Sequence, residues 1–334
     1  MKAIRVRQPA SLDRLELGSC EAVAPGPGEI RVRIRAASIN FRDVLIAKGF
    51  FPVADGLIPL SDGAGDVVEV GVGVTGFAVG DAVVSTFHPA WSDGHIEKSQ
   101  LTTSPGGPAD GYACAMATRS VAHFTHAPKG LSHAEAATLT CAGVTAWRAL
   151  ADGGAKPGAT VLVLGTGGVS LFALQFAKAA GATVIATSSS PEKLERLKAL
   201  GADHVINHRE DAAWGQTALA LTGGLGVDHI IEVGGPHTLP QSLVAARTGG
   251  HLAIVGAVGG FDIDHFPFAI VQAKRLRVQG VTVGSRRDQT DMVRAIEANH
   301  IRPVIDSSFP LDRLGDAFRH LDAGGHFGKI AIEV

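Results

Sequence analysis

Aromatic residues, cysteine and runs of like charge are scarce in this sequence, and these scarcities limit the kind of core, partner and metal site that we expect. Aromatic side chains make up 5% of the 334 residues, so the core is expected to consist mainly of Val, Leu, Ile and Ala. The net charge is −2 without a basic stripe, which argues against nucleic acid as a partner. The three scattered cysteines argue against a disulfide framework or a four-thiolate metal site and suit a reducing compartment; they are Cys20, Cys114 and Cys141.

Long hydrophobic runs are also missing. No apolar stretch approaches the roughly 20 residues that a membrane-spanning helix needs, and the first ten residues lack the apolar core of a secretory signal. We therefore expect a cytoplasmic protein without membrane segments. At 334 residues the chain exceeds what one core usually supports, so two domains are expected. Glycine is abundant, at 42 residues, which fits many tight turns and close approaches of the backbone to a ligand.

The first third of the chain predicts short strands. β-Branched residues alternate or cluster at 3–7, 29–37 and 64–70, and glycine and proline turns separate these segments. This pattern is typical of a β-rich domain built on a partly open barrel.

The pattern changes near Leu131, after which strands alternate with helices. Ser132, with Glu135 three residues later, is a capping-box signal for a helix start. Apolar strands that alternate with helices predict a parallel, doubly wound sheet. The expected strands are 160–164, 183–187, 205–206, 229–233, 251–255, 278–283 and 329–334, and the expected helices are 169–180, one opening at Ser190-Pro191, and one near 288–298.

The strongest motif follows the strand at 160–164 and opens the next helix. Gly165 permits a tight turn, Gly167 lets the backbone approach a pyrophosphate, and amides at the helix start point at the anion. Ser170 stands where the dinucleotide fingerprint usually has its third glycine. In this strand–turn–helix context we predict cofactor binding rather than an ordinary glycine-rich turn. The motif reads Gly165, Thr166, Gly167, Gly168, Val169, Ser170.

The residues after the second strand favour NADP(H) over NAD(H). An NAD site needs an Asp or Glu about 20 residues after the fingerprint to bind the ribose 2′-hydroxyl, and no acid occurs between Gly181 and Pro191. Ser188 and Ser189 can donate to a 2′-phosphate, which a carboxylate would repel. Lys193, one turn into the next helix, is expected to neutralise the phosphate, and the alternative is a solvated helix lysine.

Several blocks of sequence together resemble the medium-chain dehydrogenase/reductase superfamily over essentially the whole chain. The resemblance implies an α/β protein with a GroES-like catalytic domain, a β-rich partly open barrel, and a Rossmann domain with a doubly wound parallel sheet. The implied bounds are 1–124 and 285–334 for the first domain and 125–284 for the second, NADP(H)-binding domain, with the active site in the cleft between them. The blocks are 37–43, 59–68, 79–81, 141–147, the glycine-rich turn, 200–207 and 325–329.

The resemblance also implies positions that contact the cofactor. Thr145 corresponds to the residue beside the nicotinamide, and Lys329 to a residue that often closes over the cofactor. For each position the alternative is a structural loop or strand residue. The other implied cofactor contacts are His208, the loop residues Gly256 and Val258, and the backbone of Val281 and Val283.

Zinc alcohol dehydrogenases of this superfamily bind the metal through a thiolate, an imidazole with an adjacent Glu, and a second thiolate. Here the first thiolate position carries Asn40 and the His-Glu pair is Ser61-Asp62, so only Cys141 matches. The resemblance therefore predicts no metal site and an enzyme that works without zinc. Cys141 is interpreted as a small buried residue at a helix start.

Loss of the metal limits the chemistry. Reducing a carbonyl directly needs an acid for the developing alkoxide, whereas adding hydride to an alkene conjugated to a carbonyl needs only hydrogen-bond donors to the carbonyl oxygen. Residues 40–43 also resemble a block found in the enoyl reductase domains of fatty-acid and polyketide synthases. We therefore predict an NADPH-dependent quinone or enoyl reductase that acts on a small electrophile. Asn40 and Thr145 are the candidate catalytic residues.

Three points stay open at the level of sequence. The alternatives to a quinone or enoyl reductase are a metal-free alcohol dehydrogenase or carbonyl reductase, and a cofactor-binding protein without enzymatic activity. The proton donor is either water or one of four side chains, and Arg42 with Asp43 is expected to form a structural pair under the site. The strand at 278–283 is expected at a sheet edge, which in this family often pairs with its two-fold mate, so a homodimer is expected. The four candidate proton donors are Lys48, Asp62, His88 and His95.

Overall fold

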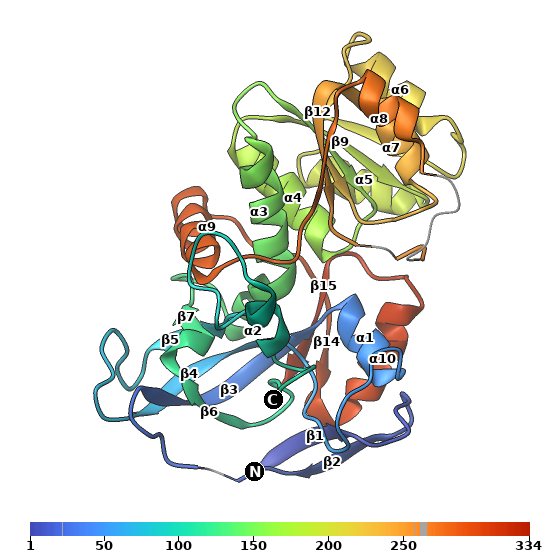
Figure 1. Cartoon of the computed structure of the whole chain (residues 1–334). Coiled ribbons are helices and arrows are strands. Elements are labelled where there is room, and N and C mark those ends of the chain that lie inside the picture. Colours follow the sequence, from blue (N-terminus) through green and yellow to red (C-terminus); the bar gives the residue numbers. More distant parts are fainter. Residues whose placement is uncertain (22, 257, 261–265) are drawn as a thin grey trace. The chain divides into compact units, whose positions relative to one another are not determined.

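The computed structural model describes residues 1–21, 23–256, 258–260 and 266–334, and the chain divides into two compact units (Figure 1). One unit comprises Met1–Val144 and Val283–Val334, and the other comprises Thr145–Thr282. The first division falls after Val144 rather than at the expected 124/125. The reason is that α2 (His133–Ala137) and the π-helical segment η3 (Leu139–Gly143) pack on strands of the first unit.

The first unit is built on an antiparallel sheet that both ends of the chain complete. Among the described residues the strand order is β14-β15-β3-β4-β5-β7, with β6 paired to β3, and β1 and β2 form a separate hairpin. Within the part of this sheet that the structure describes, only β14 and β15 run parallel. The strands are β1 (Lys2–Val6), β2 (Leu15–Ser19), β3 (Glu29–Ile39), β4 (Asp62–Val70), β5 (Ala82–Ser85), β6 (Met116–Ser120), β7 (Phe124–His126), β14 (Ile305–Pro310) and β15 (Lys329–Glu333).

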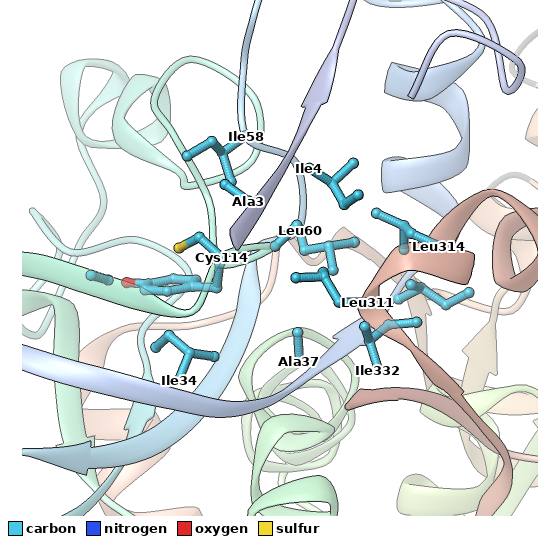
Figure 2. Packing of buried hydrophobic residues seen from close by; sticks show 14 of the residues in the cluster. Ala3, Ile4, Ile34, Ala37, Ile58, Leu60, Cys114, Leu311, Leu314 and Ile332 are labelled. Carbon is cyan, nitrogen blue, oxygen red and sulfur yellow. The ribbon is translucent and has the colours of Figure 1, made fainter. Parts of the chain in front are cut away.

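The core of this unit joins segments that are distant in sequence. In Figure 2, Ile4 from β1, Ala37 from β3 and Ile332 from β15 converge on leucines of the carboxyl-terminal helical segment. Alternate side chains of β3 point into this core, as the period of a half-buried strand requires. The remaining helices of the unit are α1 (Phe41–Ala47), η1 (Lys98–Thr103), η2 (Val121–His123), α9 (Arg286–Asn299), η4 (Leu311–Arg313) and α10 (Leu314–Asp322).

The second unit is a parallel sheet with the strand order β10-β9-β8-β11-β12-β13 in the described residues. Numbered along the chain this is 3-2-1-4-5-6, the order of a Rossmann fold, and it confirms the expected fold class. The strands are β8 (Thr160–Leu164), β9 (Thr183–Ser188), β10 (His204–Asn207), β11 (Val227–Glu232), β12 (Ala246–Ile254) and β13 (Arg277–Gly280). The helices are α3 (Val144–Gly153), α4 (Gly168–Ala179), α5 (Pro191–Ala199), α6 (Trp214–Leu221), α7 (Leu239–Ala245) and α8 (Phe268–Ala273).

Two of the helix starts expected from sequence are confirmed. Ser132 Oγ accepts from the Glu135 N–H at 3.2 Å, and the Glu135 carboxylate accepts from the Ser132 N–H at 2.7 Å. Pro191 is the first residue of α5, and Ser190 Oγ accepts from the Lys193 N–H at 3.3 Å. Such caps satisfy amides that have no partner inside the helix.

The expected strand at 278–283 is too long at its carboxyl end. Strand β13 ends at Gly280, although the Val281 N–H still donates to the Ile254 carbonyl at 2.9 Å. Val283 has a φ of 55°, in the left-handed region, which a strand cannot contain. The expectation that this strand lies at a sheet edge is confirmed, because β13 pairs only with β12 among the described strands. None of the described helices has the length and apolar character needed to cross a bilayer.

Candidate functional site

The glycine-rich turn of the Rossmann unit joins the carboxyl end of β8 to α4. Gly165 has a φ of 71°, and its N–H donates to the Thr187 carbonyl at 3.0 Å, which ties the turn to the end of β9. A Cβ added at Gly165 or Gly167 would meet no atom within 4 Å, so the space beside both glycines is open. Ser170, in place of the third glycine, donates from Oγ to the Leu164 carbonyl at 2.6 Å and binds the helix to the strand.

This turn fits the pyrophosphate of a dinucleotide. Gly167 is the N-cap of the 12-residue helix α4 and brings no side chain over the first-turn amides. Those amides, together with the positive end of the helix dipole, favour an anion in the open space. Thr166 is buried, whereas Gly168 and Val169 are half-buried at the helix start.

The end of β9 carries the hydroxyls expected near a 2′-phosphate. The Ser188 side chain is buried, and its Oγ accepts from the Ser190 N–H at 3.2 Å, which leaves the hydroxyl proton free to donate. The Ser188 carbonyl accepts from the His208 N–H at 3.1 Å, so His208 at the end of β10 lies beside it. Burial lowers the pKa of His208. Ser189 and Lys193 are half-buried next to these residues.

The loops after β11 and β12 meet at the same carboxyl edge of the sheet. The Val255 N–H donates to the Glu232 carbonyl at 2.9 Å and the Val258 N–H donates to the Val233 carbonyl at 3.3 Å. Gly256 lies between them, and Val258 is 61% exposed; residue 257 lies outside the described residues. In parallel sheets, cofactors bind at the carboxyl ends of the strands, where the strand order reverses. The structure thus brings together the turn at 165–170, Ser188 and Gly256.

Sequence reasoning missed Glu232 at this edge. Its buried carboxylate accepts from the Gly234 and Gly235 amides at 2.9 and 3.0 Å and from two hydroxyls, those of Thr238 and Ser242, at 2.5 Å each. These bonds fix the loop that follows β11. An acid at the end of an apolar strand, two residues before a glycine pair, was the available signal.

Three further positions expected from the resemblance lie where the chain passes from one unit to the other: Thr145 and Val281 near the two ends of the Rossmann unit, and Val283 at the start of the second segment of the first unit. Thr145 is 4% exposed in the first turn of α3. Val281 and Val283 follow β13, and both are buried.

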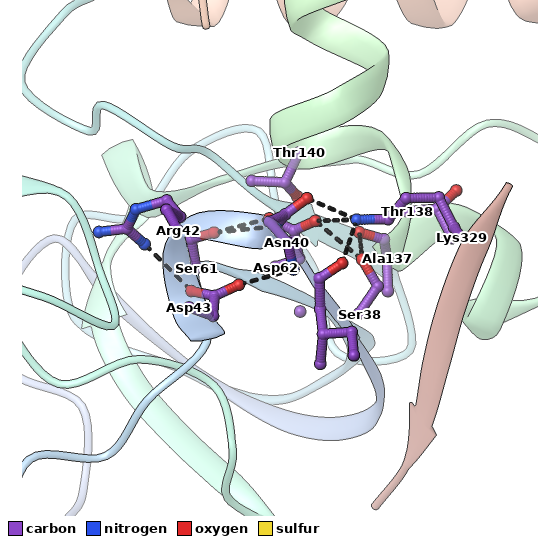
Figure 3. Close-up of polar contacts among 12 residues, drawn as sticks. Ser38, Asn40, Arg42, Asp43, Ser61, Asp62, Ala137, Thr138, Thr140 and Lys329 are labelled. Carbon is purple, nitrogen blue, oxygen red and sulfur yellow. Dashed lines mark hydrogen bonds and ion pairs between the residues drawn. The ribbon is translucent and has the colours of Figure 1, made fainter. Parts of the chain in front are cut away.

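The first unit contains a buried polar cluster, made of Ser38, Asn40, Ser61, Asp62 and Lys329 (Figure 3). We call it the Asn40 cluster. Strand register assembles it, because Ile330 pairs with Ile39 and Ser38 pairs with Asp62. The end of β3, the start of β4 and the start of β15 therefore meet at one point.

Lys329 is the centre of the Asn40 cluster. Its Nζ donates to the Ile39 carbonyl at 2.7 Å and to Asn40 Oδ1 at 2.5 Å, and lies 3.5 Å from Asp62 Oδ2. Lys329 is 4% exposed and Asp62 is fully buried. An ammonium has three donors, and all three point at oxygens of this unit. The resemblance implies that Lys329 closes over the cofactor; in the structure its ammonium is directed at Asn40 and Asp62.

Two serine hydroxyls provide further hydrogen bonds to the Asp62 carboxylate oxygens. Ser61 Oγ donates to Oδ1 and Ser38 Oγ donates to Oδ2, both at 2.8 Å. Asn40 Nδ2 donates to Ser61 Oγ at 3.4 Å. A buried charge is tolerated when it is paired and hydrogen-bonded in this way. Asp62, a candidate proton donor, is thus hydrogen-bonded within the Asn40 cluster. Lys48, another candidate, forms an ion pair in which its Nζ lies 2.7 Å from Asp322 Oδ1.

Arg42 and Asp43 form the structural pair expected under the site. Arg42 Nη1 lies 3.2 Å from Asp43 Oδ1, and Asp43 Oδ2 accepts from the Asn40 N–H at 2.9 Å at the start of α1. Arg42 also lies over the Phe87 ring, 4.9 Å from its centroid. Burial raises the pKa of Asp43 to about 6, and the Arg42 guanidinium opposes that rise.

Comparison with known proteins identifies the family. Residues 26–129 match the alcohol dehydrogenase GroES-like domain, and residues 168–298 match the family described as zinc-binding dehydrogenase. A zinc-type alcohol dehydrogenase-like protein of Schizosaccharomyces pombe is 43% identical over 316 residues, which cover 92% of this chain and 91% of that protein. The chain belongs to the medium-chain dehydrogenase/reductase superfamily. It is an oxidoreductase of this superfamily's alcohol dehydrogenase-like, nicotinamide-dependent type.

Solved structures of the superfamily differ in their cofactor. A proposed alcohol dehydrogenase from Sinorhizobium meliloti 1021 has a TM-score of 0.93 at 40% identity and covers 100% of this chain and 98% of its own. An NAD-dependent alcohol dehydrogenase has a TM-score of 0.91 at 34% identity, with 100% of both chains covered. The crotonyl-CoA carboxylase/reductase AntE in complex with NADP has a TM-score of 0.85 at 25% identity, and the match covers 100% of this chain and 94% of the AntE chain.

The zinc-ligand positions of the superfamily carry residues that do not fit a zinc ion here. Burial raises the pKa of the Cys141 thiol to about 12, so the sulfur keeps its proton at neutral pH. The Lys329 ammonium already lies against Asn40 Oδ1 and Asp62 Oδ2. Among the described residues, no three His, Cys, Asp or Glu side chains stand together as a metal site would require.

The raised pKa of Asp43 predicts a pH-dependent contribution to stability. A carboxyl whose pKa is 3.8 when unfolded and about 6 when folded stabilises the protein most below pH 3.8 and loses that contribution as pH rises through 6. Relative to Asp43→Asn, the wild type should lose up to about 3 kcal/mol of unfolding free energy between pH 4 and pH 8. Urea unfolding of both proteins across this range measures it. A difference that is constant, or that grows with pH, contradicts the raised pKa.

Proposed function

We propose that this protein is an NADPH-dependent reductase of alkenes conjugated to a carbonyl, as in enones, enoyl thioesters and quinones, and that it works without zinc. The observation that carries the proposal is the Asn40 cluster: Asn40, Ser61 and Asp62 stand at the zinc-ligand positions implied by the resemblance, and the Lys329 ammonium donates to Asn40 and lies against Asp62. An ammonium and an amide N–H can stabilise a charged oxygen without a Lewis acid. The similarity to AntE, named as a crotonyl-CoA carboxylase/reductase, supports this class of reaction.

The chain's own residues have defined tasks in this proposal. Bound NADPH would supply the hydride, which adds to the alkene carbon farther from the carbonyl. The amides at 167–170 bind the pyrophosphate, and Thr145 orients the nicotinamide. Asn40 Nδ2 donates to the substrate carbonyl oxygen, where negative charge accumulates. Water then protonates the other alkene carbon, since the ammonium of Lys329 and the carboxylate of Asp62 are engaged with each other.

A second candidate function is direct reduction of a carbonyl to an alcohol, or the reverse reaction, oxidation of an alcohol. The relatives named as alcohol dehydrogenases favour it. A neutral amide is a poor substitute for a Lewis acid when an isolated alkoxide develops, because the charge stays on one oxygen. We therefore rank alkene reduction first.

A substrate that contains both a C=C and a C=O bond distinguishes the two candidate functions, because each function gives a different product. With NADPH and cinnamaldehyde or 2-cyclohexenone, we expect the saturated carbonyl compound and no allylic alcohol, as identified by gas chromatography and mass spectrometry. Allylic alcohol as the main product would establish the carbonyl reductase instead. NADPH binding without oxidation, over a panel that also includes quinones and aldehydes, would contradict both candidates.

We propose that the 2′-phosphate of NADPH binds at Ser188, Ser189 and Lys193, beside His208. Replacing Lys193 with Gln removes one positive charge near that phosphate and should raise the KM for NADPH about tenfold, the effect of roughly 1.4 kcal/mol. The KM for NADH should stay unchanged. Lys198→Gln on the same helix is the matched control, because Lys198 is exposed and pairs with Glu195. Equal effects of Lys193→Gln on both cofactors would refute the assignment.

We also propose a homodimer formed through β13. This edge strand leaves backbone groups for pairing with a second copy, and Val278 on it is 37% exposed. Light scattering after size exclusion should show a dimer for the wild type and a monomer for Val278→Lys. Val72→Lys, at an 80% exposed valine of the other unit, should remain dimeric. A wild-type monomer at micromolar concentration would exclude this interface.

A further inference from the structure

We propose that Lys329 is a positioning residue that holds the Asn40 amide in one orientation, so that Nδ2 serves as the hydrogen-bond donor to the substrate. The inference rests on the proposed function only for the nature of that substrate. It assigns Lys329 to neither the cofactor nor the substrate, because its ammonium is already directed at three oxygens of its own unit.

The donor directions in the Asn40 cluster form a closed ring. Lys329 Nζ donates to Asn40 Oδ1, Asn40 Nδ2 donates to Ser61 Oγ, Ser61 Oγ donates to Asp62 Oδ1, and Asp62 Oδ2 faces Lys329 Nζ. An ammonium only donates and a carboxylate only accepts, so these two ends fix the direction of every bond between them. The orientation of the Asn40 amide follows from that direction.

The opposite amide orientation is unfavourable. It would place the Asn40 NH₂ group against the Lys329 ammonium, 2.5 Å from its present oxygen partner, with two donors facing each other in a buried site. A buried donor without an acceptor destabilises the conformation that contains it. Without the ammonium this penalty disappears, and only the long 3.4 Å contact with Ser61 Oγ still favours the present orientation, so the amide is held far less firmly.

The fixed amide keeps one N–H for a ligand. Asn40 Nδ2 carries two hydrogens, and Ser61 Oγ accepts one of them over a long 3.4 Å contact. The Asn40 backbone is held separately, since its N–H donates to Asp43 at the start of α1. Backbone and side chain are therefore both fixed before substrate binds, which is what a preorganised donor requires.

Lys329→Met tests the inference because it keeps the length of the side chain and removes the ammonium. We expect kcat for the enone to fall about 10²-fold, the usual effect of losing one oriented donor. The Kd for NADPH, measured by fluorescence, should stay within about twofold. Lys129→Met, which removes an exposed lysine of the same unit, is the control and should keep kcat.

The decisive comparison adds Asn40→Ala. If Lys329 acts through the amide, Lys329→Met should cause no further loss of kcat in the Asn40→Ala background, because nothing remains to be oriented. A multiplicative loss in the double variant would overturn the inference. So would unchanged kcat in Lys329→Met, or a weakened NADPH affinity with kcat intact, which would return Lys329 to the cofactor.

Lys329→Met leaves the Asp62 carboxylate buried without its ion pair and could fail to fold for that reason. Lys329→Met combined with Asp62→Asn removes both charges and makes the same prediction for kcat, with folding checked by circular dichroism. The proposed function is tested separately by the wild-type product. Should that product be an allylic alcohol, the proposed function fails, whereas the comparison of Lys329 and Asn40 variants still decides the present inference.

Discussion

The buried ammonium of Lys329, paired with Asp62 and bonded to Asn40, is the interaction on which this account of the protein depends. A positive charge that is 4% exposed must be neutralised and hydrogen-bonded, and the cluster does both with groups from three strands. Its partners Asn40 and Asp62 stand at the zinc-ligand positions that the resemblance implies. The chemistry proposed here therefore uses oriented N–H donors in place of a Lewis acid.

The fold explains how such a cluster can exist. Lys329 is almost at the end of the chain and Asn40 is near its beginning, and antiparallel pairing of β15 with β3 places them side by side. Each unit thus positions a different candidate site on helices and strands. Strand ends hold the polar cluster in the first unit, and the carboxyl edge of a parallel sheet holds the glycine-rich turn in the second.

Local signals explain why much of the fold was predictable from sequence. The strand at 160–164, the caps at Ser132 and Ser190, and the glycine-rich turn each depend on neighbours within a few residues, so their patterns are visible in the sequence. The carboxyl-terminal end of β13 could not be predicted from the sequence. Val281 and Val283 are β-branched and favour a strand, but backbone geometry at Val283 excludes one.

Side-chain partners that come from distant segments were the least predictable part of the site. The resemblance placed Lys329 near the cofactor, and only the register of β15 against β3 shows that Asn40 and Asp62 receive its hydrogen bonds. Glu232 was missed for a similar reason, because two of its four partners, Thr238 and Ser242, lie on the far side of a loop. The pair of Arg42 and Asp43 was expected, since adjacent opposite charges at a helix start need no distant partner.

The central claim is that an ammonium, and not a metal, completes the Asn40 cluster in the active protein. Elemental analysis of purified protein with measured NADPH-dependent turnover, before and after dialysis against a strong chelator, tests it most directly. We expect far less than one zinc per chain and the same turnover in both samples. One zinc per chain, together with activity that is lost on chelation and restored by zinc, would contradict the account.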